Sequence, residues 1–318
     1  MKRTYMLIGL VLASLTILVA CTSPVATPAQ VATTAPSQAQ TDEPAPASPT
    51  SPPAEPQAAL VNGTPILMSD YEHQVAQYEA SLAAAGQDPN TPEGQATLAE
   101  GRAWVLEIMI EQVLIEHAAK EAGVTVTNEA LDATIQSLYD EIGQKAFEDW
   151  LANEGMSLDE MRERLRGDMI ATQMANQIAE SVPTHSEHIQ ARHILVPTEE
   201  EAKQILSQLQ AGGDFVSLAR TYSQDISTRD TGGDLGYFPK GILTSPEVEA
   251  AAFALQPGQI SAVIPSSLGY HIVQVVQRNP DMEISPENLR LLRDKAVQEW
   301  LDGLRAAADI QRFVSSTP

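Results

Sequence analysis

The stretch GGDLGYFPKG at residues 232–241 decides the fold of the C-terminal half of this 318-residue chain. It predicts a short strand at 234–238, and the surrounding sequence predicts further strands at 190–196, 259–264 and 269–277. Helices are expected at 199–210, 214–222 and 246–255. Because these strands and helices do not alternate regularly, we expect a mixed α+β domain over residues 189–280 rather than a doubly wound sheet.

Three other motifs lie in order around this stretch: ARHILV at 191–196, YSQD at 222–225 and GYHIV at 269–273. Together the four motifs resemble a parvulin-type (rotamase) peptidyl-prolyl cis-trans isomerase over about 90 residues. The resemblance implies a four-stranded sheet with surrounding helices and a site that rotates Xaa-Pro bonds. Such a rotation crosses a barrier of about 18–20 kcal/mol but breaks no bond, so no metal and no cofactor are expected.

The same resemblance assigns the candidate catalytic residues. His193 and His271 match paired histidines in the hydrogen-bond network of parvulins. Asp225 matches the acidic position beside the substrate carbonyl, where an electrostatic role is expected because no proton leaves the substrate. Ser266 matches a hydroxyl position five residues before the second histidine. The expected substrate-binding residues, which would line an apolar proline pocket, are Leu235, Phe238, Leu243 and Val248.

Other interpretations of these residues stay open. Buried histidines can be purely structural, and Leu235 and Phe238 would be core residues in any fold. One extra residue in this region places Val248 where parvulins usually have a larger apolar side chain, which leaves pocket size and catalytic rate open. His185 and His188, close to the first histidine of the pair, could suggest a metal site. A solvated linker is the preferred interpretation of that segment.

Residues 60–188 predict a separate helical module. A turn at Asn62-Gly63 is expected within a short extended segment at its start. Helices are expected to begin at capping boxes at 69–72 and 157–160. The sequence TPE at 91–93 predicts the start of a long helix whose apolar middle indicates a buried central position.

The order of these elements over about residues 60–183 resembles the N-terminal chaperone region of SurA-type and PrsA-type bacterial foldases, most recognisably in VNG at 61–63 with Ser69 and Tyr71. The resemblance implies binding of unfolded polypeptides. Methionine side chains can line adaptable binding surfaces, although a core position is the plainer interpretation of each one. Six of the nine methionines lie in this module: Met68, Met109, Met156, Met161, Met169 and Met174.

The N-terminus predicts a lipoprotein signal peptide at residues 1–20. Lys2 and Arg3 precede an apolar run that is short for a bilayer span. Small residues then lead to Cys21, the only cysteine, in a pattern that resembles a bacterial lipidation site. An uncleaved anchor or an ordinary signal peptide is the alternative. Residues 21–59, rich in proline, alanine and threonine, predict a disordered tether.

Residues 281–318 predict a C-terminal helix that begins at Ser285-Pro286 and carries an apolar stripe. In the foldases that this chain resembles, such a helix packs back on the N-terminal module. The parvulin domain would then be an insertion in a discontinuous chaperone domain. An independent capping helix is the alternative.

Charge and cysteine content narrow the function. The net charge of −23 argues against nucleic acid as a partner, because phosphate binding needs a basic face. A single cysteine excludes a disulfide framework. We therefore expect an extracytoplasmic foldase, held at the bacterial membrane by lipid on Cys21, that isomerises Xaa-Pro bonds in unfolded exported polypeptides. A non-enzymatic holdase and a peptide-binding scaffold lipoprotein are the alternatives, and a homodimer is left open.

Overall fold

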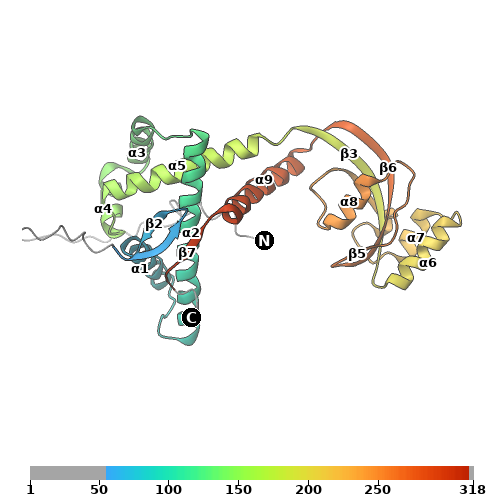
Figure 1. Ribbon diagram of the computed structural model, residues 1–318, viewed down its shortest axis with the longest axis horizontal. Coiled ribbons are helices and arrows are strands. Elements are labelled where there is room, and N and C mark those ends of the chain that lie inside the picture. The colour runs from blue at the N-terminus through green and yellow to red at the C-terminus, as the bar shows by residue number, and fades with distance from the viewer. Residues whose placement is uncertain (1–54, 315–318) are drawn as a thin grey trace, which may run out of the picture. The chain divides into compact units, whose positions relative to one another are not determined.

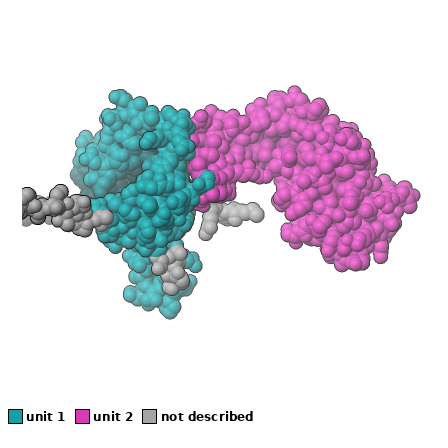
Figure 2. All heavy atoms as spheres, in the orientation of Figure 1, with its two compact units in different colours: residues 1–170, 307–318 teal, residues 171–306 magenta. Residues whose placement is uncertain are grey.

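The computed structural model describes residues 55–314, which form two compact units (Figure 2). The described part of unit 1 comprises residues 55–170 and 307–314, and unit 2 comprises residues 171–306. The expected signal peptide, Cys21 and the tether up to residue 54 lie outside the described residues. The tether ends earlier than the expected residue 59, because β1 begins at Gln57.

Unit 1 combines helices with a three-stranded antiparallel sheet of order β2-β1-β7 (Figure 1). The expected turn at Asn62-Gly63 joins β1 to β2, and both of its residues have positive φ angles, 47° and 83°. The third strand comes from the far end of the chain and pairs with β1. The elements of this unit are β1 (Gln57–Val61), β2 (Thr64–Leu67), α1 (Met68–Ala84), α2 (Pro92–Ala122), α3 (Asn128–Ile142), α4 (Gln144–Asn153), α5 (Leu158–Glu180) as far as residue 170, and β7 (Ile310–Arg312).

Two of the predicted helix starts are confirmed and one is wrong. The Thr91 side chain caps α2, and Ser157 and Glu160 form a reciprocal capping box with hydrogen bonds of 2.7 and 3.2 Å. The box at 69–72 does not form, because β2 runs directly into α1 and leaves Ser69 inside the first turn. The hydroxyl of Ser69 donates to Asp70 instead.

The long helix α2 is the buried centre of unit 1, as its apolar middle predicts. Leu106 and Ile110 on this helix are 2% and 0% exposed. A further core cluster surrounds Phe147 and includes Met156 and Met161, so these two methionines serve the core. Of the other four methionines, Met174 is buried, and the remaining three are half-buried: Met68, Met109 and Met169.

Unit 2 contains the predicted four-stranded sheet, which is antiparallel throughout with the order β4-β3-β6-β5 (Figure 1). The mixed α+β class expected from the sequence is therefore confirmed. Besides the end of α5, the elements of this unit are β3 (His185–Val196), α6 (Glu199–Gln210), α7 (Phe215–Tyr222), the 3-10 helix η1 (Arg229–Thr231), β4 (Asp234–Pro239), α8 (Pro246–Ala254), β5 (Ile264–Ser266), β6 (Gly269–Glu283) and α9 (Pro286–Ala307) up to residue 306.

The strand expected at 259–264 forms only in part, because Ile260 makes an isolated bridge to Gln274 and the regular strand begins at Ile264. Only β5 pairs with this edge of β6 as a strand. Immediately before β5 the chain runs beside β6, but the N–H of Val273 donates to the hydroxyl of Ser261 at 2.9 Å. A side chain thus takes the place of a backbone carbonyl, and no regular ladder forms there.

The solvated linker expected at 185–188 is also wrong. These residues begin β3 and pair with the end of β6, His185 opposite Glu283. His188 is only 3% exposed, and its Nδ1 lies 3.0 Å from the carbonyl oxygen of Ser186. The sheet therefore runs past the expected domain limits at 188/189 and 280/281.

The sheet of unit 2 is covered on both faces by apolar clusters. Helices α6 and α7 pack on one face, where Ile194 and Ile272 point. Helix α8 packs on the other face, against Ala191 and Val273. Successive side chains along a strand point to opposite faces, so the residues two positions from Ala191 and Val273, at 193 and 271, share the α8 face.

The C-terminal segment divides between the two units. Helix α9 begins where predicted, with the hydroxyl of Ser285 accepting the N–H of Asn288 at 3.3 Å, and belongs to unit 2 up to residue 306. The strand β7 belongs to unit 1. It is therefore this last strand that extends the unit 1 sheet.

Candidate active site

The four side chains predicted as catalytic form one hydrogen-bonded chain in unit 2. Asp225 Oδ2 lies 2.6 Å from His193 Nε2. The Nδ1 atoms of His193 and His271 are 3.4 Å apart, and the two rings stack at 23° with centroids 5.6 Å apart. His271 Nε2 lies 2.8 Å from Ser266 Oγ. The fold thus brings together residues that are far apart in the sequence.

The pairing of the central strands explains how the histidines meet. His193 on β3 is opposite Val273 on β6, and His271 is opposite Leu195. The two histidines are therefore diagonal neighbours on one face, at a distance that ring side chains can span. They are 7% and 2% exposed, so the sheet holds them in a largely water-free position.

Asp225 lies in the loop that follows α7. The hydroxyl of Ser223 accepts the N–H groups of Leu195 and Asp225 at 3.2 and 3.3 Å, which ties the loop to β3. The carboxylate of Asp225 accepts hydrogen bonds from the N–H and hydroxyl of Ser227 and from the hydroxyl of Thr228. The loop thus fixes the carboxylate before any substrate is bound.

The surroundings of Asp225 keep it ionised. Burial alone raises the pKa of the carboxyl, but hydrogen bonds from Ser227, Thr228 and His193 outweigh burial and hold the pKa well below its usual value. Asp225 therefore carries a full negative charge at neutral pH. No other partner is needed to maintain that charge.

One arrangement of protons satisfies every hydrogen bond of the chain. His193 donates its Nε2–H to Asp225, His271 donates its Nδ1–H to His193, and Ser266 donates its hydroxyl to His271. Burial, followed by the neighbouring His193, lowers the pKa of His271 to about 4. The neutral state of His271 is therefore the stable one at neutral pH.

The four predicted pocket residues belong to one apolar cluster on the face covered by α8. Phe238 and Val248 are each 3% exposed and form part of its core. Leu235 and Leu243 are half-buried and pack against that core. Among the four, these two leucines are the ones with surface available to a ligand.

Sequence reasoning missed two polar residues that bear on this region. The hydroxyl of Thr228 lies 3.1 Å from His193 Nε2 and donates to Asp225. The acid three residues before a threonine could have indicated this, because such side chains bond within their own loop. The buried carboxylate of Glu249 accepts hydrogen bonds from the loop at 241–243. Glu247, two residues earlier on the same helix, is exposed, and the sequence does not distinguish the two acids.

Metal binding was considered for the histidines of β3. Within residues 55–314, no three His, Cys, Asp or Glu side chains are grouped so that they could hold a metal ion. His188 bonds to a nearby backbone carbonyl, and His193 is already bonded to Asp225 and Thr228. The histidines of β3 are thus engaged within the protein.

The sheet and its histidine chain define a peptidyl-prolyl isomerase domain of the rotamase class. A family model described as a PPIC-type PPIASE domain matches residues 193–277, and one described as a SurA-like N-terminal domain matches residues 46–175. The first match spans the site and most of the sheet, from His193 in β3 to Gln277 in β6. The second spans most of unit 1.

The relatives that match this chain include proteins named foldase protein PrsA. The chain is 31% identical over 279 residues to foldase protein PrsA of Caldanaerobacter subterraneus, a match that covers 80% of this chain and 86% of that protein. It is 50% identical over 90 residues to foldase protein PrsA 2 of Bacillus cereus, covering 28% of this chain and 31% of that protein. A crystal structure of PrsA from Bacillus anthracis aligns at 32% identity with a TM-score of 0.42, covering 63% and 94% of the two chains. The chain belongs to the PrsA foldase family.

Proposed function

We propose that this protein is an extracytoplasmic foldase that isomerises Xaa-Pro bonds in exported polypeptides at the Asp225–His193–His271–Ser266 chain. The observation that carries the proposal is the position of this chain on the same sheet face as the apolar cluster with Leu235 and Leu243. A polar group for the amide thus lies on the same face as an apolar surface for the proline ring.

The charge of Asp225 supplies a physical route to catalysis. In a planar amide, conjugation adds negative charge to the carbonyl oxygen, and twisting the C–N bond removes this added charge. A fixed carboxylate beside that oxygen therefore repels the planar ground state more than the twisted state. Differential binding of about 1.4 kcal/mol accounts for each tenfold of rate.

The remaining groups of the chain position Asp225 rather than react. His193 and Thr228 donate to the carboxylate from the sheet and from its own loop. Ser266 fixes the proton of His271, which in turn fixes that of His193. We assign Leu235 and Leu243 to the accessible wall of the proline site. Phe238 and Val248 support that wall from the core.

Unit 1 is the proposed binding module for unfolded chains. Residues 60–188 hold 23 acidic and 6 basic residues, so their net charge is −17. Such a charge keeps a chain-binding module soluble and separate from other copies. We propose the part of residues 60–188 that lies in unit 1 as the chaperone domain. The four-stranded sheet of unit 2, which extends past residues 189–280 at both ends, is the proposed isomerase domain with its helices. Of residues 281–318, β7 is the strand that returns to unit 1.

Location outside the cytoplasm fits a foldase of this family. No helix among residues 55–314 is long and apolar enough to cross a membrane. We propose that lipid on Cys21 anchors the protein, with residues 21–56 as a tether, because β1 begins at Gln57. At about 3.1 Å per residue in an extended polyproline conformation, a tether of this length reaches at most roughly 110 Å.

An isomerase assay on the full chain tests the proposal against its alternatives. The protein should accelerate cis-trans exchange of a proline-containing tetrapeptide, measured by NMR exchange spectroscopy. It should also slow aggregation of several unrelated unfolded proteins. Aggregation control without isomerase activity would support a holdase, and binding of one peptide with neither activity would support a scaffold.

A further inference from the structure

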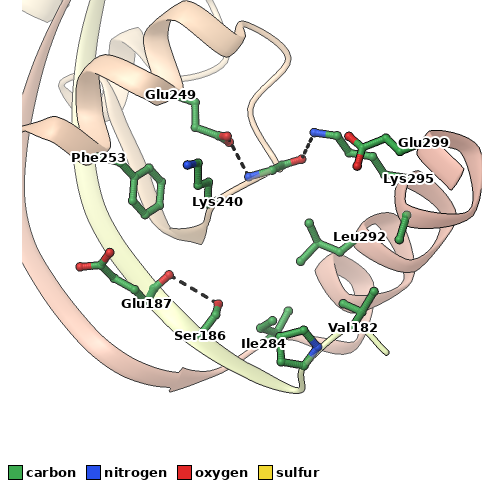
Figure 3. Close-up of a pocket in the computed structure, with 13 residues that line it drawn as sticks. Val182, Ser186, Glu187, Lys240, Glu249, Phe253, Ile284, Leu292, Lys295 and Glu299 are labelled. Carbon is green, nitrogen blue, oxygen red and sulfur yellow. Dashed lines mark hydrogen bonds between the residues drawn. The ribbon is translucent and has the colours of Figure 1, made fainter. Parts of the chain in front are cut away.

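Glu249 is a charged residue buried without a charged partner in its immediate hydrogen bonds. It is 8% exposed, in the first turn of α8. Its carboxylate accepts the N–H groups of Gly241, Ile242 and Leu243 at 2.8, 3.0 and 3.0 Å. Figure 3 shows the Glu249 side chain reaching from its helix to this loop. Buried carboxylates are rare unless they are satisfied in this way, so the contact is specific.

The same loop is held from its other side by α9. Lys295 Nζ donates to the carbonyl oxygen of Gly241 at 3.3 Å, as Figure 3 also shows. Gly241 has a φ of +99°, and a Cβ placed there would lie 2.7 Å from Leu292 Cδ2. Only glycine therefore permits this backbone and this close approach of the helix. A pocket of about 520 Å³ borders the loop, with Phe253 and Glu187 among its other lining residues.

The loop ends at Leu243, which packs against the apolar cluster that contains Phe238 and Val248. Three consecutive N–H groups bonded to one carboxylate leave the backbone at 241–243 little freedom to move. The position of the Glu249 carboxylate thus determines where Leu243 lies on the α8 face.

We propose that Glu249 is the positioning residue of the proline site, fixing the loop at 241–243 so that Leu243 forms one wall for the proline ring. The inference rests on the proposed function, because it assigns Leu243 to that wall. Glu249 itself touches no substrate. Its removal should weaken the binding of planar and twisted proline amides alike, which raises KM and leaves kcat nearly unchanged.

Glu249→Gln in the full chain is the direct test, because it keeps the side-chain size but replaces one accepting oxygen with a donor. KM and kcat for a proline tetrapeptide would be measured by NMR exchange spectroscopy. We expect KM to rise about tenfold with kcat within about twofold. The matched control is Glu201→Gln, which makes the same charge change at an exposed position on α6 and should leave both constants unchanged.

Two further measurements separate this inference from the proposed function. Amide hydrogen exchange at 241–243 should speed up in Glu249→Gln, while exchange in β3 stays at the wild-type rate. NMR titration with the peptide gives its Kd even without catalysis. If the wild type binds but does not catalyse, the proposed function fails, and a weaker Kd in Glu249→Gln still supports positioning. Wild-type KM and Kd in the variant, or a wild-type protein that binds no proline peptide, would overturn the inference.

Discussion

The Nε2 atom of His193 lies 2.6 Å from Asp225 Oδ2, while the opposite ring nitrogen of the same histidine faces His271 at 3.4 Å. One imidazole thus connects a charged loop residue to the neighbouring strand of the sheet. Because the histidine is bonded on both sides, its orientation and proton position are set by the fold. The same bonds orient the carboxylate of Asp225, so the charge proposed to act on the substrate is held in place beforehand.

The pKa of His271 predicts how stability changes with pH. Its folded value of about 4 is below the ordinary 6.5, so between these values the unfolded chain binds a proton that the folded protein does not. The free energy of unfolding should therefore fall as the pH drops through this window. His271→Asn removes this titrating group, so the urea-unfolding midpoint of the variant should fall less steeply as the pH drops. The midpoint would be measured from NMR signals of residues in unit 2. Equal slopes for variant and wild type would contradict the burial argument.

Val248 gives a prediction about packing. It is 3% exposed in the cluster with Phe238, Ala252 and Ile264, so a larger side chain has no free space to enter. Val248→Phe should lower the free energy of unfolding by about 1–3 kcal/mol, with Val248→Met at the lower end. Urea unfolding measures this. A variant with unchanged stability and faster isomerisation would show instead that Val248 lines a proline site that is too wide.

The proposed anchor is tested by Cys21→Ser. The substitution lies outside the described residues, and it should release the protein from membranes without changing the unfolding midpoint of units 1 and 2. Fractionation followed by immunoblotting gives the distribution, and mass spectrometry of the membrane-bound wild type should detect acyl chains. Unchanged membrane association in the variant would reject lipid anchoring at this residue.

Chaperone activity should survive the loss of isomerase activity. Asp225→Ala in the full chain alters the proposed catalytic carboxylate in unit 2 and leaves unit 1 intact. The Asp225→Ala variant should therefore slow the aggregation of an unfolded client as well as the wild type does. Light scattering measures this aggregation. Loss of this protection in the variant would mean that unit 1 is not the chain-binding module.

Much of the site could be predicted because its residues lie in short, spaced motifs. His193, His271, Asp225 and Ser266 stand at fixed positions around the sheet, and the structure joins them into one chain. Glu249 could not be predicted, because its role depends on a loop folding back over α8. An acid in the first turns of a helix is ordinarily explained by the helix dipole alone.

Of two errors in the predicted fold, one has a local cause and the other a long-range cause. Ser69 has the spacing of a capping box, but the preceding strand β2 continues into α1 and leaves no free N-cap position for it. The preferred interpretation of residues 185–188 from the sequence, a solvated linker, places His188 in solvent. The long pairing of β3 with β6 buries it instead. The burial of His188 depends on a strand distant in sequence, which local patterns do not contain.

The most direct test of the central claim is the isomerisation rate of a proline tetrapeptide with Asp225→Ala, beside the wild type and the control Asp230→Ala. Asp230 lies nearby in η1 and is exposed; its carboxylate accepts a hydrogen bond from Arg229, and its backbone carbonyl accepts one from Arg220. We predict a loss of tenfold or more in kcat for Asp225→Ala, on the order of 1.4 kcal/mol, with wild-type rates for Asp230→Ala. A folded Asp225→Ala protein that isomerises the peptide at the wild-type rate would contradict the account.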